Sequence, residues 1–184
     1  MMRIAIVSPS TLPSHSGNSI LAERLTRELS SRGHALSLFN AGSDYCGQGE
    51  MQCPDLVHSL HAVKPGKWLE KFFIPCRMPW VITLTGTDYN ARPQKKDSNA
   101  VLEKNVTEAS ALVVFHDEAY DTLHKAFPQV RSRIHIIPQG VDFCMHTAGS
   151  DSTRRQYGLK QTEVVFFMAA GIRPVKNITL ALEA

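Results

Sequence analysis

Short apolar runs alternate with amphipathic segments along most of the chain. The apolar runs predict strands at residues 3–7, 34–40, 55–60, 80–84, 111–115 and 134–137. Segments with helical spacing lie between them, at about residues 19–32, 64–75, 97–108 and 117–127. This alternation predicts an α/β fold, a Rossmann-like parallel sheet with helices on both faces.

The helix predicted at residues 19–32 has the clearest pattern. Leu21, Leu25 and Leu29 recur every four residues and form one apolar face. Gly33 is the expected C-terminal cap, because glycine adopts the left-handed conformation at no steric cost. As an ordinary turn, the preceding loop would supply Asn18 or Ser19 as the N-terminal cap.

The pattern changes near residue 160. Residues 164–170, Val-Val-Phe-Phe-Met-Ala-Ala, are apolar throughout, which is typical of a strand covered on both faces. A short helix is expected near residues 152–157, and another begins at residue 178. We interpret residues 1–160 as one Rossmann-like domain and residues 161–184 as the truncated start of a second domain. The apolar strand should add to the first sheet or dock on a second copy, giving a homodimer through residues 161–184.

The composition argues against several classes of function. The chain has 20 Lys and Arg against 17 Asp and Glu, and a net charge of +3 is too small to indicate a nucleic-acid partner. None of the four cysteines lies in a C-x-x-C pair, so no zinc or other metal site is suggested. The sequence has no signal-peptide core and no apolar run of membrane-spanning length, so we expect a cytoplasmic protein without a transmembrane segment.

The loop of residues 14–19, Ser-His-Ser-Gly-Asn-Ser, is the first candidate site. It precedes a helix whose N-terminal N–H groups can hold an anion, and Gly17 would let a ligand approach the backbone. An ordinary capped turn is the alternative. The pattern G-x-G-x-x-G is absent, which argues against a flavin- or nicotinamide-dependent oxidoreductase, the third and weakest hypothesis.

Three further loops follow strands. Thr85-Gly86-Thr87-Asp88 ends a central strand, where open α/β sheets bind ligands, although Gly86 and Asp88 also suit a plain turn. His61, with His58, is a candidate acid or base or else a structural histidine. Gln139 lies in Pro-Gln-Gly-Val-Asp, which by itself indicates only a turn.

Arg173 and Lys176 lie between the apolar run and the last helix. Two cations at such a place can bind a diphosphate and stabilise it as a leaving group, or they can form a solvated surface pair.

Taken in order, these segments resemble the glycosyltransferase 4 family, which has the two-domain GT-B fold, and within it the branch named glycosyltransferase 1 domain-containing protein 1. The likeness covers nearly the whole chain, and it implies that residues 1–160 are the acceptor-side domain and residues 161–184 the truncated start of the nucleotide-sugar-binding domain. It is carried by the loop at residues 15–25, by Thr85-Gly86-Thr87-Asp88-Tyr89-Asn90, by the less specific Glu103-Lys104-Asn105, by Pro138-Gln139-Gly140-Val141-Asp142, and by Gly171-Ile172-Arg173-Pro174-Val175-Lys176-Asn177.

The resemblance implies a retaining transfer of a sugar from a nucleotide-diphosphate sugar to a small-molecule, glycan or lipid acceptor, with no metal or other cofactor. It implies roles for ten residues: Asp88 and Thr85 in catalysis; Gly17, Asn18, Arg173 and Lys176 at the donor diphosphate; His15, Gly86, His61 and Gln139 at the acceptor. Thr85 departs from the family, in which many members carry a histidine that contacts the transferred sugar. We expect the chain alone to be inactive, and a non-catalytic glycan- or phosphosugar-binding module is the alternative.

Overall fold

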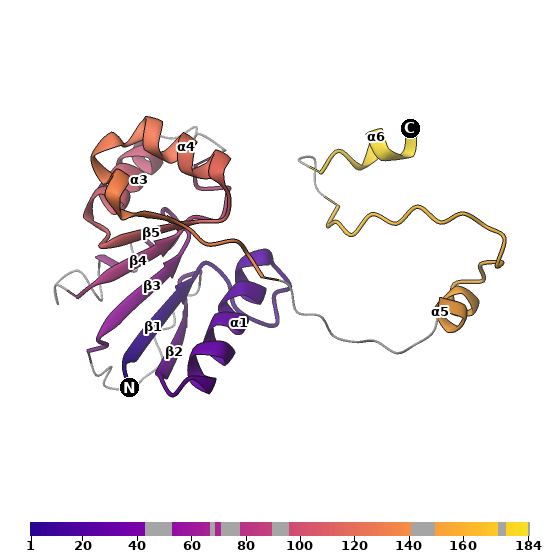
Figure 1. Cartoon of the computed structure of the whole chain (residues 1–184), viewed down its shortest axis with the longest axis horizontal. Coiled ribbons are helices and arrows are strands. Elements are labelled where there is room, and N and C mark those ends of the chain that lie inside the picture. Colours follow the sequence, from indigo (N-terminus) through magenta and orange to yellow (C-terminus); the bar gives the residue numbers. More distant parts are fainter. Residues whose placement is uncertain are drawn as a thin grey trace. The chain divides into compact units, whose positions relative to one another are not determined.

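The computed structural model describes residues 1–42, 53–66, 69–70, 78–89, 96–140, 150–172 and 176–183. The chain divides into two compact units, Met1–Gly140 and Val141–Ala184 (Figure 1). We describe each unit by itself, and the domain boundary expected between residues 160 and 161 stays a prediction.

A six-stranded parallel sheet forms the centre of the first unit (Figure 1). Its order is β2-β1-β3-β4-β5-β6. The strands are β1 Arg3–Ser8, β2 Ala35–Asn40, β3 Leu56–Leu60, β4 Trp80–Thr83, β5 Ala111–Val114 and β6 Ile134–Ile136. All six strand predictions are confirmed to within one or two residues, and with them the Rossmann-like α/β fold.

Helices cover both faces of the sheet. They are α1 Gly17–Ser31, α3 Lys96–Glu108, α4 Asp117–Ala126 and the 3-10 helix η2 Pro128–Arg133. Successive residues of β1 alternate between two apolar clusters, because side chains of a strand point to opposite faces. Ile4 and Ile6 pack with α1, whereas Ala5 and Val7 belong to the cluster that includes α3 and α4 (Figure 1).

Capping interactions determine where α1 begins and ends. Ser16 is the N-terminal cap and Ser19 completes a capping box, so the expected Asn18 or Ser19 cap was wrong by two or three positions. At the other end Gly33 has φ +85, and His34 N–H donates to the carbonyl of Leu29 over 3.2 Å. This confirms the predicted glycine cap, and the bonding is that of a Schellman motif.

Two parts of the first unit differ from expectation. The sequence did not predict η2, which begins at Pro128, a residue suited to the first turn of a helix. The helix expected at residues 64–75 lies partly outside the described residues, of which 66, 69 and 70 are helical.

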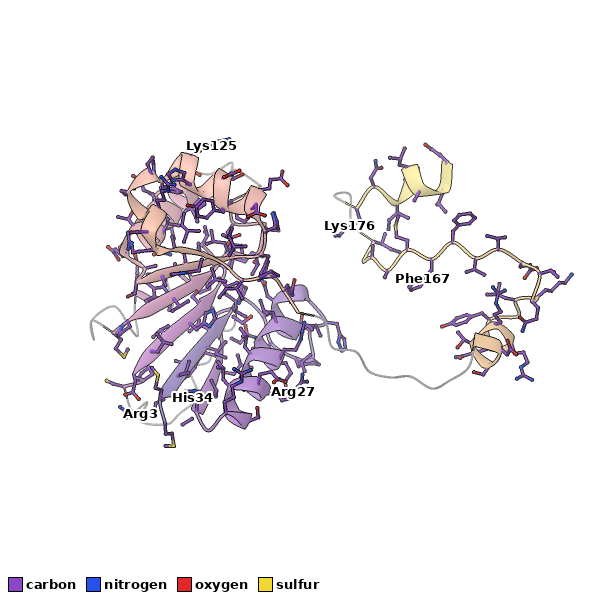
Figure 2. All side chains as sticks on the ribbon, in the orientation of Figure 1. Arg3, Arg27, His34, Lys125, Phe167 and Lys176 are labelled. Carbon is purple, nitrogen blue, oxygen red and sulfur yellow. The ribbon has the colours of Figure 1, made fainter. Side chains whose placement is uncertain are left out.

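The second unit contains the short helices α5 Ser150–Gln156 and α6 Ile178–Glu183, both near predicted positions. The strand expected at residues 164–170 was wrong: the segment joins neither the sheet nor any described ladder, and Phe166 is 94% exposed and Phe167 86%. Figure 2 shows Phe167 on this segment. A strand needs neighbouring N–H and C=O groups, and apolar composition alone does not supply them.

Among the helices in the described ranges, none has the length and apolar character that a membrane crossing requires.

Candidate functional site

The strand order creates a switch point between β1 and β3. The chain leaves β1 toward β2 on one side, then returns to lay β3 on the other side of β1. The loops that follow β1 and β3 therefore diverge, and open α/β sheets bind ligands in the crevice formed there at the carboxyl ends of the strands. The first loop leads into α1, and the second begins with His61.

Buried polar side chains gather along β1, β3 and β4 and the loops that follow them. In the part of the chain that the structure describes, the buried polar and charged residues are Ser8, Ser19, Ser59, His61, Thr83, Asp88 and Asn105. Burying such groups is unfavourable unless they are hydrogen-bonded, so the partners of each one are informative. Asn105 differs from the others in lying on α3.

Asp88 joins the loops after β3 and β4. Its carboxylate is 1% exposed and accepts hydrogen bonds from the N–H groups of Ala62 (3.1 Å), Thr85 (3.1 Å) and Gly86 (3.0 Å). Gly86 has φ +99, a conformation that favours glycine. The Asp88 oxygens are engaged by the backbone, so this residue fixes the shape of the two loops.

His61 occupies the first position after β3. Its N–H donates to the carbonyl of Thr83 over 2.9 Å, and its Nδ1 accepts from the N–H groups of Val63 (3.0 Å) and Lys64 (3.2 Å). The side chain is buried, and its φ of +92 lies in the region that favours glycine. Burial lowers the pKa of His61, Asp88 opposes that shift, and Lys64 adds to it.

Asn105 of α3 supports the same turn and was missed as a site residue. Its Nδ2 donates to the carbonyl of Ala62 over 2.6 Å, and the residue is buried. The signal was present in the sequence, because Asn105 is the polar member of an apolar helical stripe with Leu102 and Ala109.

The N-terminus of α1 lies after β1. The Ser16 and Ser19 side chains are engaged in the cap, and Ser10 Oγ lies 2.5 Å from Ser16 Oγ. Gly17 is exposed, and a Cβ placed on it would meet nothing within 4 Å. Asn18 is half-buried and His15 exposed. The backbone of Gly17 is therefore open to a ligand.

The remaining predicted residues are more dispersed. Gln139 is exposed, and the neighbouring Gly140 carbonyl accepts from Arg24 of α1 over 2.6 Å, which holds this segment beside α1. Lys176 is exposed in the second unit (Figure 2), and Arg173 lies outside the described residues. Within the first unit, the structure therefore brings Thr85, Gly86, Asp88 and His61 together.

His58 of β3 is a structural histidine. Its Nε2 lies 2.8 Å from Thr83 Oγ1, and burial lowers its pKa to about 4. The ring is thus neutral near pH 7. Within the described ranges, no group of three or more His, Cys, Asp or Glu side chains is arranged to hold a metal ion.

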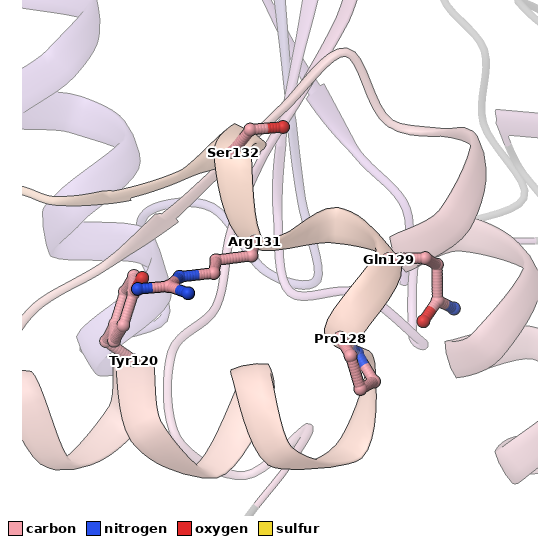
Figure 3. Close-up of a pocket in the computed structure, with 5 residues that line it drawn as sticks. All are labelled: Tyr120, Pro128, Gln129, Arg131 and Ser132. Carbon is pink, nitrogen blue, oxygen red and sulfur yellow. The ribbon is translucent and has the colours of Figure 1, made fainter.

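Two of the hollows formed by the described residues lie at α4, and neither is lined by a predicted site residue. One, of about 590 Å³, is lined by Tyr89 and by residues of α3 and α4, with Phe127. The other, of about 440 Å³, is lined by Tyr120, Pro128, Gln129, Arg131 and Ser132, and Figure 3 shows Arg131 extended toward Tyr120.

No protein-family model matches the chain.

Proposed function

We propose that the chain is the acceptor-side part of a retaining glycosyltransferase of family 4 with the GT-B fold, which moves a sugar from a nucleotide-diphosphate donor to an acceptor. The observation that carries the proposal is the set of buried polar side chains at the carboxyl edge of β1, β3 and β4, beside the switch point between β1 and β3. Transfer is proposed for the full-length, cytoplasmic enzyme.

The N-terminus of α1 would take the donor diphosphate. Gly17 and Asn18 are the first residues of a 15-residue helix, whose N-terminal N–H groups carry partial positive charge. The exposed backbone of Gly17 permits close approach. The family resemblance also assigns Arg173 and Lys176 to the donor diphosphate, and with two cations in that role no metal is invoked.

The loops after β3 and β4 would border the acceptor. Thr85 and Gly86 lie in a turn whose N–H groups donate to the Asp88 carboxylate. His61 lies in the neighbouring loop, which Asp88 contacts through the N–H of Ala62. In this proposal Asp88 acts as a positioning residue, because its carboxylate oxygens are committed to backbone N–H groups. His15 and Gln139, both exposed, would form the outer part of the site.

A charge placed at Gly17 tests the proposal. Gly17→Asp adds a carboxylate to the first turn of α1, which favours the helix but repels a diphosphate; Gly17→Asn is the neutral control of equal size. We expect calorimetry with UDP, GDP and ADP to show a preferred diphosphate that the Asp variant binds at least about tenfold more weakly than the Asn variant, which corresponds to about 1.4 kcal/mol. Equal affinities of the two variants would show that the diphosphate does not bind at the N-terminus of α1.

A second function is favoured by one observation. Asp88 has its oxygens engaged by the backbone, and Thr85 stands where a sugar-contacting histidine is common in the family, so the same fold could bind a glycan or phosphosugar without catalysis. In that case the full-length protein would bind a free glycan with equal affinity in the presence and absence of nucleotide, and would transfer no sugar.

A further inference from the structure

The ring of His61 has a defined protonation pattern. Its Nδ1 accepts two backbone hydrogen bonds, from Val63 N–H at 3.0 Å and Lys64 N–H at 3.2 Å. A ring nitrogen that accepts carries no proton, so the proton of the neutral imidazole resides on Nε2. Burial lowers the pKa of His61, which keeps the ring neutral near pH 7.

The Nε2–H donor has no protein acceptor among the described residues. The atom is buried, and the hydroxyl of Thr85 is a second buried polar atom of this kind. A buried donor without an acceptor destabilises the fold. His61 also holds a φ of +92, an unfavourable conformation for a residue other than glycine. Such unfavourable features on one residue point to a functional constraint.

The two atoms belong to adjoining segments. The N–H groups of Ala62 and Thr85 both donate to Oδ2 of Asp88, at 3.1 and 3.3 Å. One carboxylate oxygen of Asp88 therefore bridges Ala62, which follows His61, and Thr85, whose hydroxyl is the second of the two buried atoms. Both lie at the carboxyl edge of the sheet, where β3 and β4 are paired.

We propose that His61 Nε2–H and the Thr85 hydroxyl each hydrogen-bond an uncharged hydroxyl group of the substrate, which makes the ligand class a sugar or another polyol. The inference rests on the proposed function, since it assigns a substrate group to the same site. Neutral imidazole offers a hydrogen bond without charge. The Asp88 carboxylate and the Lys64 ammonium act on His61 in opposite directions, so the surroundings do not select an anion.

Access requires a local movement. Nε2 and the Thr85 hydroxyl are shielded from solvent, whereas Thr87 at the tip of the loop is exposed. In this proposal, a ligand hydroxyl reaches them when the tip moves aside, and it then supplies a partner to two atoms that have none among the described residues. The stability recovered in this way favours the bound state.

His61→Asn isolates the donor. Asparagine tolerates positive φ, and its Oδ1 can accept the Val63 and Lys64 N–H groups as Nδ1 does, but it places no donor at the Nε2 position. Thr85→Val removes the hydroxyl at nearly constant volume, and Thr87→Val is the matched control at the exposed tip.

The binding assay is calorimetry on the whole chain with UDP-glucose, UDP, myo-inositol and inorganic phosphate. We expect His61→Asn and Thr85→Val to weaken binding about five- to tenfold for one hydroxyl-bearing probe, with UDP and phosphate unaffected and Thr87→Val like the wild type. Loss for UDP-glucose assigns the hydroxyl to the donor sugar, and loss for myo-inositol assigns it to the acceptor. Wild-type affinities for all probes in both variants would overturn the inference alone, whereas a wild type that binds no probe would overturn the proposed function as well.

A second measurement needs no ligand. Long-range proton–nitrogen spectra of the histidine rings report which nitrogen is protonated, and we expect His61 to be the neutral Nε2–H form at pH 7. A proton on Nδ1, or a charged ring at that pH, would overturn the inference.

Discussion

Replacement of Asp88 tests whether the two site loops form one structure. The carboxylate is 1% exposed and accepts three backbone N–H groups, at 3.1, 3.1 and 3.0 Å. Hydrogen bonds to a charged group contribute about 1.5–3 kcal/mol each, and they are not additive. We therefore expect Asp88→Ala to lower the free energy of unfolding by about 3–5 kcal/mol, in the range typical of a broken buried network.

Asp88→Asn provides the graded comparison. It keeps one acceptor oxygen but turns an NH₂ group toward N–H donors, so we expect roughly half the loss of the alanine variant. Urea titrations followed by far-UV circular dichroism and by tryptophan fluorescence measure both, with the exposed Asp121→Ala as control. A loss below about 1 kcal/mol for Asp88→Ala would refute the reasoning, because a residue kept only for chemistry can be removed without loss of stability.

Three further predictions concern the ends of elements, pH and association. Gly33→Ala should destabilise the chain by about 1 kcal/mol in thermal unfolding, because φ is +85 there, and an unchanged midpoint would show that the turn relaxes. His58 has its pKa lowered to about 4 by burial, so the stability it contributes is complete above its unfolded pKa of about 6.5 and is lost as the pH falls toward 4. His58→Gln should accordingly make the urea midpoint depend less on pH between 7 and 4.5 than it does in the wild type. An equally steep dependence in the variant would show that other groups cause the loss of stability. The exposed Phe166 and Phe167 should promote self-association that light scattering detects and that replacement of both by Lys abolishes; a wild type that is monomeric at high concentration would contradict the homodimer.

The sequence predicted the secondary structure of the first unit well, because its signals are local. Leu21, Leu25 and Leu29 do pack, half-buried, against the apolar cluster beneath α1, and Gly33 does adopt the left-handed conformation. The same rule failed for residues 164–170, since an apolar run specifies a strand only when a neighbour is available to pair with it.

The sequence motifs predict where the candidate site lies but not the hydrogen bonds that connect its residues. Asp88 and His61 are predictable as candidates because they follow strands, but no local pattern indicates that Asp88 accepts Ala62 N–H from another loop. Asn105 lies 43 residues from the carbonyl it binds, and such partners follow from tertiary structure alone. Local patterns therefore identified residue types at strand ends, whereas the roles depend on contacts between distant segments.

The strand order also bears on how the first unit is made. Each strand from β2 onward pairs with one that precedes it in the chain: β2 and β3 with β1, then β4, β5 and β6 each with the strand before. A sheet of this order can grow by addition at its edges as the polypeptide leaves the ribosome, without waiting for a later segment to insert between earlier ones. The hydrogen bond from Arg24 to Gly140, across 116 residues, can form only after the whole unit has been synthesised, and it connects the end of the unit to its first helix.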